Sequence, residues 1–208
     1  MNKVRIALLA VALVCTAVLW GLVFVQQSNA GEASYGEVVV VPTAERNTSE
    51  VPKEFIKEEY IPVIPDGVNI AGDAYFDANG YNDVYLPGKA KDGETKGASY
   101  WEGAPDSYPN ILTAVYQDEV TIHALRLLLC PQSVWGRRIQ TFRVEISTDG
   151  ENFTELIPST DYEFDPDRGN EVVLEFDEVT VKAVRLSFTQ NTGAVGAQLA
   201  ELEIYSKQ

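Results

Sequence analysis

The sequence predicts an all-β protein whose folded part is an antiparallel β-sandwich. Three observations support this prediction: apolar residues alternate in short segments, turn residues separate these segments, and the C-terminal part of the chain shows no helical period of useful length. In the clearest strand, Phe142, Val144 and Ile146 alternate with polar residues, which indicates one buried face. Asp149-Gly150 follows and favours a tight hairpin, because glycine tolerates a positive φ.

The other strands follow from the same alternation of apolar and polar residues. Short strands at this spacing are typical of a sandwich. Two long irregular segments, 72–101 and 130–138, interrupt the pattern, and loops of this length in a small domain are usually functional or tied by a metal. The predicted strands are 111–116, 120–129, 139–147, 171–176, 182–189 and 199–205.

The first thirty residues predict export. Lys3 and Arg5 precede an uncharged apolar run, 6–25, which is predicted to be helical, and Ser28-Asn29-Ala30 then offers the small residues of a cleavage site. The run is also long enough to span a bilayer, so residues 1–30 fit either a signal peptide or an uncleaved signal-anchor. In both cases we expect the rest of the chain to be extracellular, either secreted or anchored to the cell membrane.

Residues 31–65 have the composition of an extended linker or stalk, rich in polar residues and proline. The folded domain is therefore predicted over 66–208, and a region of about 140 residues can bury a sizeable core. Beyond the apolar run Cys130 is the only cysteine, so no disulfide is expected within the mature chain.

The exported part of the chain is strongly acidic. The full chain has a formal net charge of −15, and its first thirty residues contain two basic and no acidic residues, which leaves −17 for the remainder. A domain this negative is a poor partner for nucleic acid or anionic lipid. We therefore expect membrane contact only through the N-terminal segment, if that segment is uncleaved.

Five short motifs between Val68 and Tyr205 carry a family resemblance. They are Asn69-Ile70-Ala71, Lys89-Ala90-Lys91-Asp92-Gly93 before Trp101, Ser147-Thr148-Asp149-Gly150, Val184-Arg185-Leu186, and Leu199-Ala200-Glu201-Leu202-Glu203-Ile204-Tyr205. In this order and spacing the region resembles the discoidin, or F5/8 type C, domain and, within it, the family 32 carbohydrate-binding modules. The resemblance implies a jelly-roll β-sandwich of galactose-binding-like fold, with a ligand site in the loops at one end and Trp101 in the core.

The resemblance also implies a structural calcium ion between the Asp-Gly loop and the last strand. Calcium favours carboxylate, carbonyl and hydroxyl oxygens. Two extra residues separate Asp92 from Trp101, so Gly97 and Thr95 are alternatives to Ser99, and a simple Asp-Gly turn without metal is the alternative to the whole site. The residues assigned by position are Lys89 and Ala200 through their carbonyl groups, Asp92 and Glu201 through their carboxylates, and Glu94 and Ser99.

For the ligand site we expect an aromatic face against the sugar and a few polar groups around it. Trp135, in a polar loop, is the first candidate for this platform, and tyrosines of the first long loop are its rivals. Each aromatic residue also fits a structural role in which it packs its loop onto the sandwich. The expected ligand residues are Trp135, Arg137, Arg138, Tyr75, Tyr81, Tyr85 and Asn191.

These expectations favour a non-catalytic carbohydrate-binding module whose partner is a glycan or glycoconjugate. The alternative is an adhesion or scaffold domain of the same fold that binds a surface protein, and phospholipid binding ranks third because the negative charge opposes it. An enzyme is not expected, since no nucleophile is marked by a neighbouring base. His123 is the only histidine, which excludes a site with several histidine ligands.

Overall fold

The computed structural model describes residues 39–40, 60–95, 97–130 and 135–207. These residues all belong to one unit of the chain, 35–208. The predicted N-terminal helix and most of the predicted linker lie outside the described residues. Among the helices that are described, none is long and apolar enough to cross a membrane.

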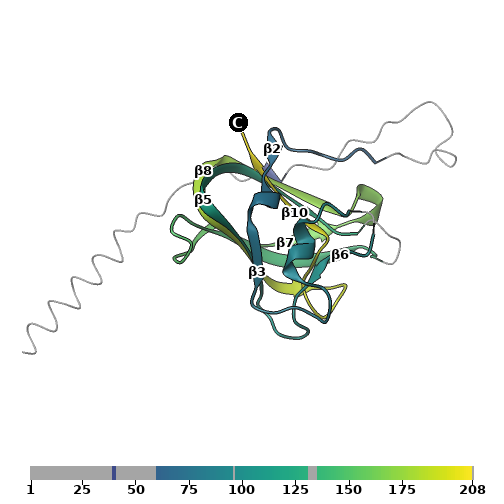
Figure 1. The fold of residues 1–208 in the computed structure, drawn as a ribbon. Helices are drawn as coiled ribbons and strands as arrows, with labels where there is room; N and C mark the ends of the chain where they lie inside the picture. The colour runs from purple at the N-terminus through teal and green to yellow at the C-terminus, as the bar shows by residue number, and fades with distance from the viewer. Residues whose placement is uncertain (1–38, 41–59, 96, 131–134, 208) are drawn as a thin grey trace, which may run out of the picture. The chain divides into compact units, whose positions relative to one another are not determined.

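The described part of the chain forms ten β-strands and three short 3₁₀ helices, and all the strand pairs are antiparallel (Figure 1). The predicted all-β sandwich is therefore confirmed. In chain order the elements are β1 (Val39–Val40), β2 (Val68–Asn69), η2 (Ala71–Asp73), β3 (Tyr75–Ala78), η3 (Pro87–Lys91), β4 (Trp101–Glu102), β5 (Asn110–Leu128), β6 (Arg138–Ser147), β7 (Thr154–Phe164), η4 (Pro166–Arg168), β8 (Glu171–Asn191), β9 (Gln198–Leu199) and β10 (Glu201–Ser206).

The long strands β5 and β8 pair with each other and run through both layers of the sandwich. Their register is interrupted between Val115 and Val120 and again between Ile122 and Ala124. Such bulges bend a strand pair, and Figure 1 shows β5 and β8 curving together. The sequence predicts two strands in place of each, because the residues at the bend interrupt the alternation.

The bend divides the hydrogen-bonded sheet into two layers. One layer contains β2, β10, the second half of β5, the first half of β8 and, at its edge, β1. The other contains β3, the first half of β5, the second half of β8, β6 and β7. Strands β4 and β9 form a separate ribbon in which Trp101 lies opposite Leu199.

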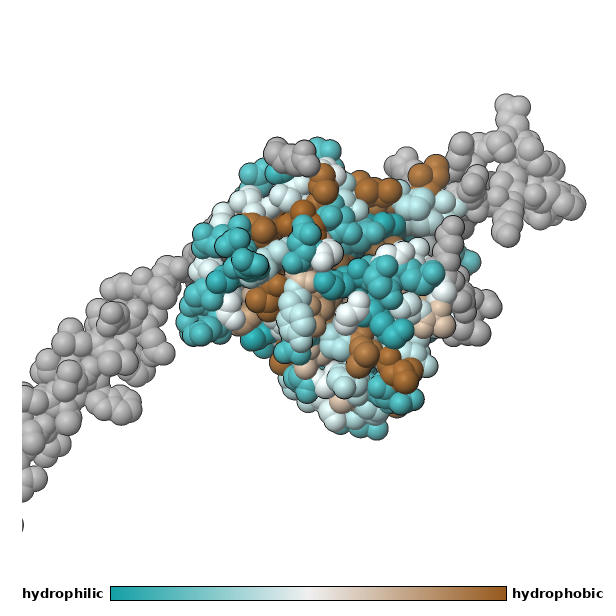
Figure 2. All heavy atoms as spheres, viewed as in Figure 1, coloured by the Kyte–Doolittle hydropathy of each residue, from teal (hydrophilic) through white to brown (hydrophobic). Residues whose placement is uncertain are grey.

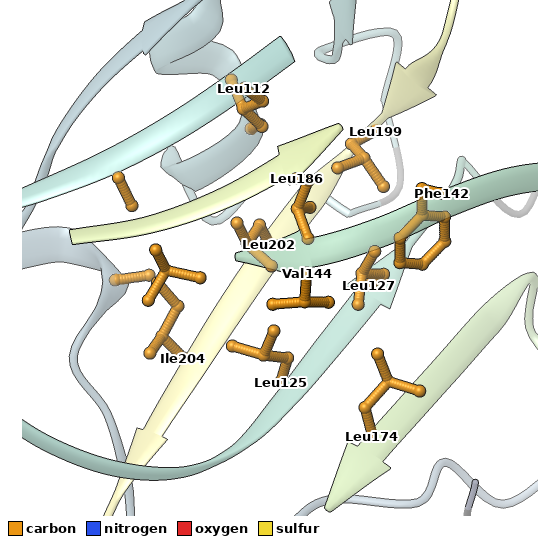
Figure 3. Packing of buried hydrophobic residues seen from close by; sticks show 14 of the residues in the cluster. Leu112, Leu125, Leu127, Phe142, Val144, Leu174, Leu186, Leu199, Leu202 and Ile204 are labelled. Carbon is orange, nitrogen blue, oxygen red and sulfur yellow. The ribbon is translucent and has the colours of Figure 1, made fainter. Parts of the chain in front are cut away.

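Large apolar side chains fill the space between the layers, as Figure 3 shows for residues of β5, β6, β8, β9 and β10. Burying one such side chain contributes about 1.5–3 kcal/mol. Trp101 is fully buried and its ring centroid lies 5.9 Å from that of Phe188, so it is a core residue, as expected.

Strand β7 is absent from the sequence-based prediction. Pro158 lies within it, and most of its side chains are exposed and polar, so the segment shows no regular alternation. It pairs with β6 at the edge of its layer, a position in which proline is tolerated.

Candidate functional site

Three loops meet at the end of the sandwich where β5 begins and β8 ends. We call them loop A (79–86), loop B (103–109) and loop C (192–197), and together they form the loop end. Hydrogen bonds join each loop to the next. The bonds are Asn79 Nδ2 to Pro109 O (2.8 Å), Gly103 N to Ala197 O (2.8 Å) and Asp106 N to Val195 O (3.0 Å).

The side chain of Asn110, the first residue of β5, connects loop B to loop C. Its buried side-chain amide donates to the carbonyl oxygens of Ala104 (3.0 Å) and Ser107 (3.3 Å). Its Oδ1 accepts a hydrogen bond from Ala197 N (2.8 Å). A Cβ at Gly103 would lie 2.4 Å from Asn110 Cγ, so only glycine fits there. The two loops are therefore fixed by satisfied buried polar groups.

A buried polar chain runs beneath the loops. Asn82 Nδ2 donates to Glu102 Oε1 (2.9 Å), and Gln198 Nε2 donates to Glu102 Oε2 (2.8 Å). Arg138 Nη1 in turn donates to Gln198 Oε1 (2.5 Å), and burial lowers the pKa of the Arg138 guanidinium. Because Glu102, Gln198 and Arg138 are all buried, this network rigidly connects loop A to β6 and β9.

Three aromatic rings form a second chain beside the polar one. The ring of Tyr85 stacks on that of Tyr100 at 4.2 Å, and Tyr100 meets Trp135 edge to face at 4.6 Å. The guanidinium carbon of Arg138 lies 5.0 Å from the centre of the Trp135 ring. Trp135 is only 9% exposed, which fits the alternative role of a packing residue better than that of an open platform.

The exposed tyrosines lie in two different places. Tyr81, in loop A, is 49% exposed. Tyr75 is 70% exposed, but it lies on β3 opposite Val115, beside the bend and away from the loop end. Of the two, Tyr81 alone offers an open ring to a ligand at the loops.

The surface of the loop end combines apolar and acidic side chains. Val84, Leu86 and Val195 are exposed there, and Figure 2 shows small hydrophobic groups on an otherwise largely hydrophilic face. Asp83 (φ 47°) and Asp106 (φ 52°) are exposed and adopt a left-handed backbone conformation, which costs energy in a residue other than glycine.

Arg137 and Asn191 are both engaged in contacts within the chain. The Arg137 side chain is exposed, but it forms ion pairs with two carboxylates: Nη2 lies 2.6 Å from Asp165 Oδ2, and Nη1 lies 3.7 Å from Glu163 Oε1. Asn191 is buried, donates to Gly196 O (2.8 Å) and accepts from the main chain of loop C. The contacts of Asn191 therefore fix loop C, whereas those of Arg137 join it to the end of β7.

The structure thus brings Tyr81, Tyr85, Trp135, Arg138 and Asn191 to the loop end, with Arg137 beside them, and leaves Tyr75 apart. The sequence gives no indication of the roles of Asn82, Glu102, Asn110 and Gln198. Each is a single polar residue whose partners are distant in sequence, so no local pattern marks it.

The expected calcium ligands lie between η3 and the start of β10. Ser99 Oγ donates to Asp92 Oδ2 (2.5 Å), and Gly93 N donates to Glu201 Oε1 (2.6 Å). Burial, together with the adjacent Asp92 carboxylate, raises the pKa of Glu201 to about 8. A bound cation would relieve the cost of holding these two carboxylates together.

The other members of the expected calcium set lie close by in the chain. Glu94 Oε1 accepts a hydrogen bond from Gly97 N (2.8 Å), Lys89 lies on η3, and Ala200 directly precedes Glu201. Among the described residues, no group of three or more His, Cys, Asp and Glu side chains is arranged so that it could hold a metal ion. The residues of the expected set offer carboxylate, carbonyl and hydroxyl oxygens, which are the ligands that calcium favours.

Comparison with solved structures shows what this architecture is similar to. A pectin-binding module is 20% identical (TM-score 0.53; 64% of this chain and 91% of the module are covered). A family 32 module from Clostridium perfringens, solved with GalNAc-β-1,3-galactose, is 21% identical (TM-score 0.56; 65% and 97%). A chitosan-binding module from a Paenibacillus sp. IK-5 chitosanase/glucanase is 20% identical (TM-score 0.55; 67% and 99%). At this identity the likeness shows the fold.

These three neighbours are binding modules and not catalytic domains. Others form part of larger enzymes, and the match spans 15% of a family 89 glycoside hydrolase from Clostridium perfringens. No curated protein matches the chain. The F5/8 type C domain family matches residues 75–202, more than half of the sequence. The chain therefore belongs to the F5/8 type C domain family.

Proposed function

We propose that this chain is an exported, non-catalytic carbohydrate-binding module that holds a glycan at the loop end. The observation that carries the proposal is Tyr81, a half-exposed aromatic ring on a loop that a part-buried hydrogen bond from Asn82 to Glu102 ties to the fold. Similar structures include modules solved with GalNAc-β-1,3-galactose and with galactose, which supports a sugar as the ligand class. Export rests on the N-terminal sequence, with its apolar run and small-residue cleavage site.

Recognition would combine stacking with hydrogen bonds. The ring of Tyr81 would cover the C–H face of a sugar, and the carboxylates of Asp83 and Asp106 would accept hydrogen bonds from its hydroxyl groups. Because Asn110 and the Glu102–Gln198 pair fix the loops beforehand, little conformational entropy would be lost on binding.

We also propose a structural calcium ion near η3. Asp92, Ser99 and Glu201 would hold it together with Glu94 and the carbonyl groups of Lys89 and Ala200. The ion would neutralise the paired carboxylates and tie the Asp-Gly loop to β10, and it would not contact the sugar.

A glycan array probed with the purified full chain tests the sugar proposal. We expect binding to a restricted set of related glycans that is lost after thermal unfolding. Binding to none of the glycans, by a protein whose circular dichroism shows a folded β-domain, would rule the proposal out.

The second candidate is a domain that binds a surface protein through the same loops. The exposed apolar side chains of Val84, Leu86 and Val195 favour it, because exposed apolar groups often mark protein contacts. The double variant Val84→Ser/Leu86→Ser separates the two functions. A sugar site centred on Tyr81 should keep its affinity in this variant, whereas an apolar protein interface should lose most of its affinity.

A further inference from the structure

The pair Asn79-Gly80 lies where β3 leads into loop A, and it is the only Asn-Gly pair in the sequence. Asn79 ties loop A to loop B and to the start of β5. Its Nδ2 donates to Pro109 O (2.8 Å), and its Oδ1 accepts from Ile111 N (2.8 Å). Its main-chain N donates to Ile111 O (3.2 Å). The side-chain amide of Asn79 is therefore a structural link of the loop end.

The glycine that follows is required by the packing of the two loops. A Cβ at Gly80 would lie 3.0 Å from Ala104 Cβ, so a larger residue would press loop A away from loop B. Among the described contacts, Gly80 N has no hydrogen-bond partner. The main-chain nitrogen next to the Asn79 amide is thus neither bonded nor shielded by a side chain of its own.

The surroundings of the Asn79 amide favour attack by this nitrogen. The N–H of Ile111 points at Oδ1 and polarises the Cγ–Oδ1 bond, and it would stabilise negative charge that develops on Oδ1 during an addition. Asn79 is exposed, so water reaches the amide and a small leaving group can diffuse away.

We propose that Asn79 is a site of spontaneous deamidation in the folded protein, and that the reaction separates loop A from loop B. Gly80 N attacks Asn79 Cγ and loses its proton, the Cγ–Nδ2 bond breaks, and Nδ2 leaves as ammonia. One water molecule then opens the resulting succinimide to aspartate or isoaspartate. The balance is one water consumed and one ammonia released, with no oxidant or reductant.

Both products break the link that Asn79 provides. A carboxylate has no proton to donate to Pro109 O, so two acceptors face each other where a hydrogen bond was. Isoaspartate also adds a carbon to the main chain directly before Gly80 and thereby displaces Tyr81. The resulting loss of glycan affinity rests on the proposed function, whereas the conversion of Asn79 does not.

Peptide mass spectrometry of the full chain, incubated without ligand in mildly alkaline buffer, tests the reaction. Asn82 is the internal control, because it lies in the same loop and precedes Asp83. We expect Asn79 to convert at least about tenfold faster than Asn82, since glycine offers no β-carbon that hinders the attack. Circular dichroism of the incubated sample verifies that the domain stays folded. Equal rates at the two asparagines, or no conversion of Asn79 in the folded chain, would overturn the proposal.

The variant Asn79→Asp tests the structural consequence without waiting for the reaction. Residue-resolved hydrogen exchange should be about tenfold faster at the main-chain amide of position 79, which loses its support, and unchanged at Gly103 N, which joins loops B and C. Asn152→Asp is the matched control, because it makes the same change of charge in the β6–β7 hairpin and should leave position 79 unchanged.

Unchanged exchange at position 79 in Asn79→Asp, or equal acceleration in both variants, would refute the separation of the loops. If the chain binds a glycan, Asn79→Asp should bind it more weakly than Asn152→Asp does. A glycan array without any binding would rule out the proposed function and leave the conversion and exchange results as they are, so failures of the two proposals are distinguishable.

Discussion

The exposed fraction of the side chain distinguishes two aromatic residues that the sequence alone presents as equal candidates for a sugar platform. Trp135 and Tyr81 both lie in polar segments, and both fit a sugar platform by type. In the structure Trp135 is buried between Tyr100 and Arg138, whereas Tyr81 is half exposed. The Trp135 ring contacts Tyr100, which is distant in sequence, and no local pattern encodes such a contact.

The burial of Trp135 predicts a stability effect. Trp135→Ala should lower the free energy of unfolding by about 3 kcal/mol, because it removes a buried ring and leaves a cavity. Denaturant unfolding followed by circular dichroism measures this change. Tyr75→Ala is the matched control, since its side chain is largely exposed, and it should shift the free energy by less than about 0.5 kcal/mol. Equal shifts would show that Trp135 does not pack its segment.

At the element scale, the sequence predicts the regular strands and misses the irregular ones. Strand β6 begins and ends within one residue of its predicted range, because its alternation is unbroken. The bulges of β5 and β8 and the proline of β7 break the alternation, so these strands are predicted too short or not at all. The conformations of the loops are the features that the sequence predicts least well. Single residues such as Asn110 and Gln198 fix these loops through hydrogen bonds to residues that are distant in sequence.

The contact between η3 and β10 predicts stabilisation by calcium. Adding calcium at about one hundred times its dissociation constant should stabilise the domain by about 2.7 kcal/mol, and a chelator should remove this gain. Differential scanning calorimetry with calcium and with EDTA measures the shift. Asp92→Asn should abolish it, whereas Asp77→Asn, an exposed carboxylate on β3, should leave it intact. Identical transitions with and without calcium would show that the site binds no ion.

For the molecule as a whole, its charge indicates which class of glycan the proposed site would accept. The chain is strongly acidic, and at the loop end Arg137 is ion-paired with Asp165 while Arg138 is buried against Gln198. Both of these arginines, which lie beside the loop end, already have partners within the chain, which disfavours their pairing with the carboxylate of a sugar acid. Long-range repulsion from the acidic surface adds to this effect.

We therefore expect neutral glycans to bind better than polyuronates of the same length. Titration at low and at moderate salt measures this preference. Affinity for a neutral glycan should hardly change with salt, whereas any binding of a polyuronate should be weaker at low salt, where repulsion is less screened. A polyuronate that binds best at low salt would show that free cationic groups do reach the ligand.

The most direct test of the proposed sugar site compares the glycan affinities of two variants, each of which lacks one exposed tyrosine at a different place on the fold. Isothermal titration with a glycan that binds the unmodified chain should show at least about tenfold weaker binding for Tyr81→Ala, because a stacking platform is lost. Tyr75→Ala should bind as the unmodified chain does, since Tyr75 lies on β3 beside the bend. Unchanged affinity in a folded Tyr81→Ala, or an equal loss in both variants, would contradict a glycan site centred on loop A.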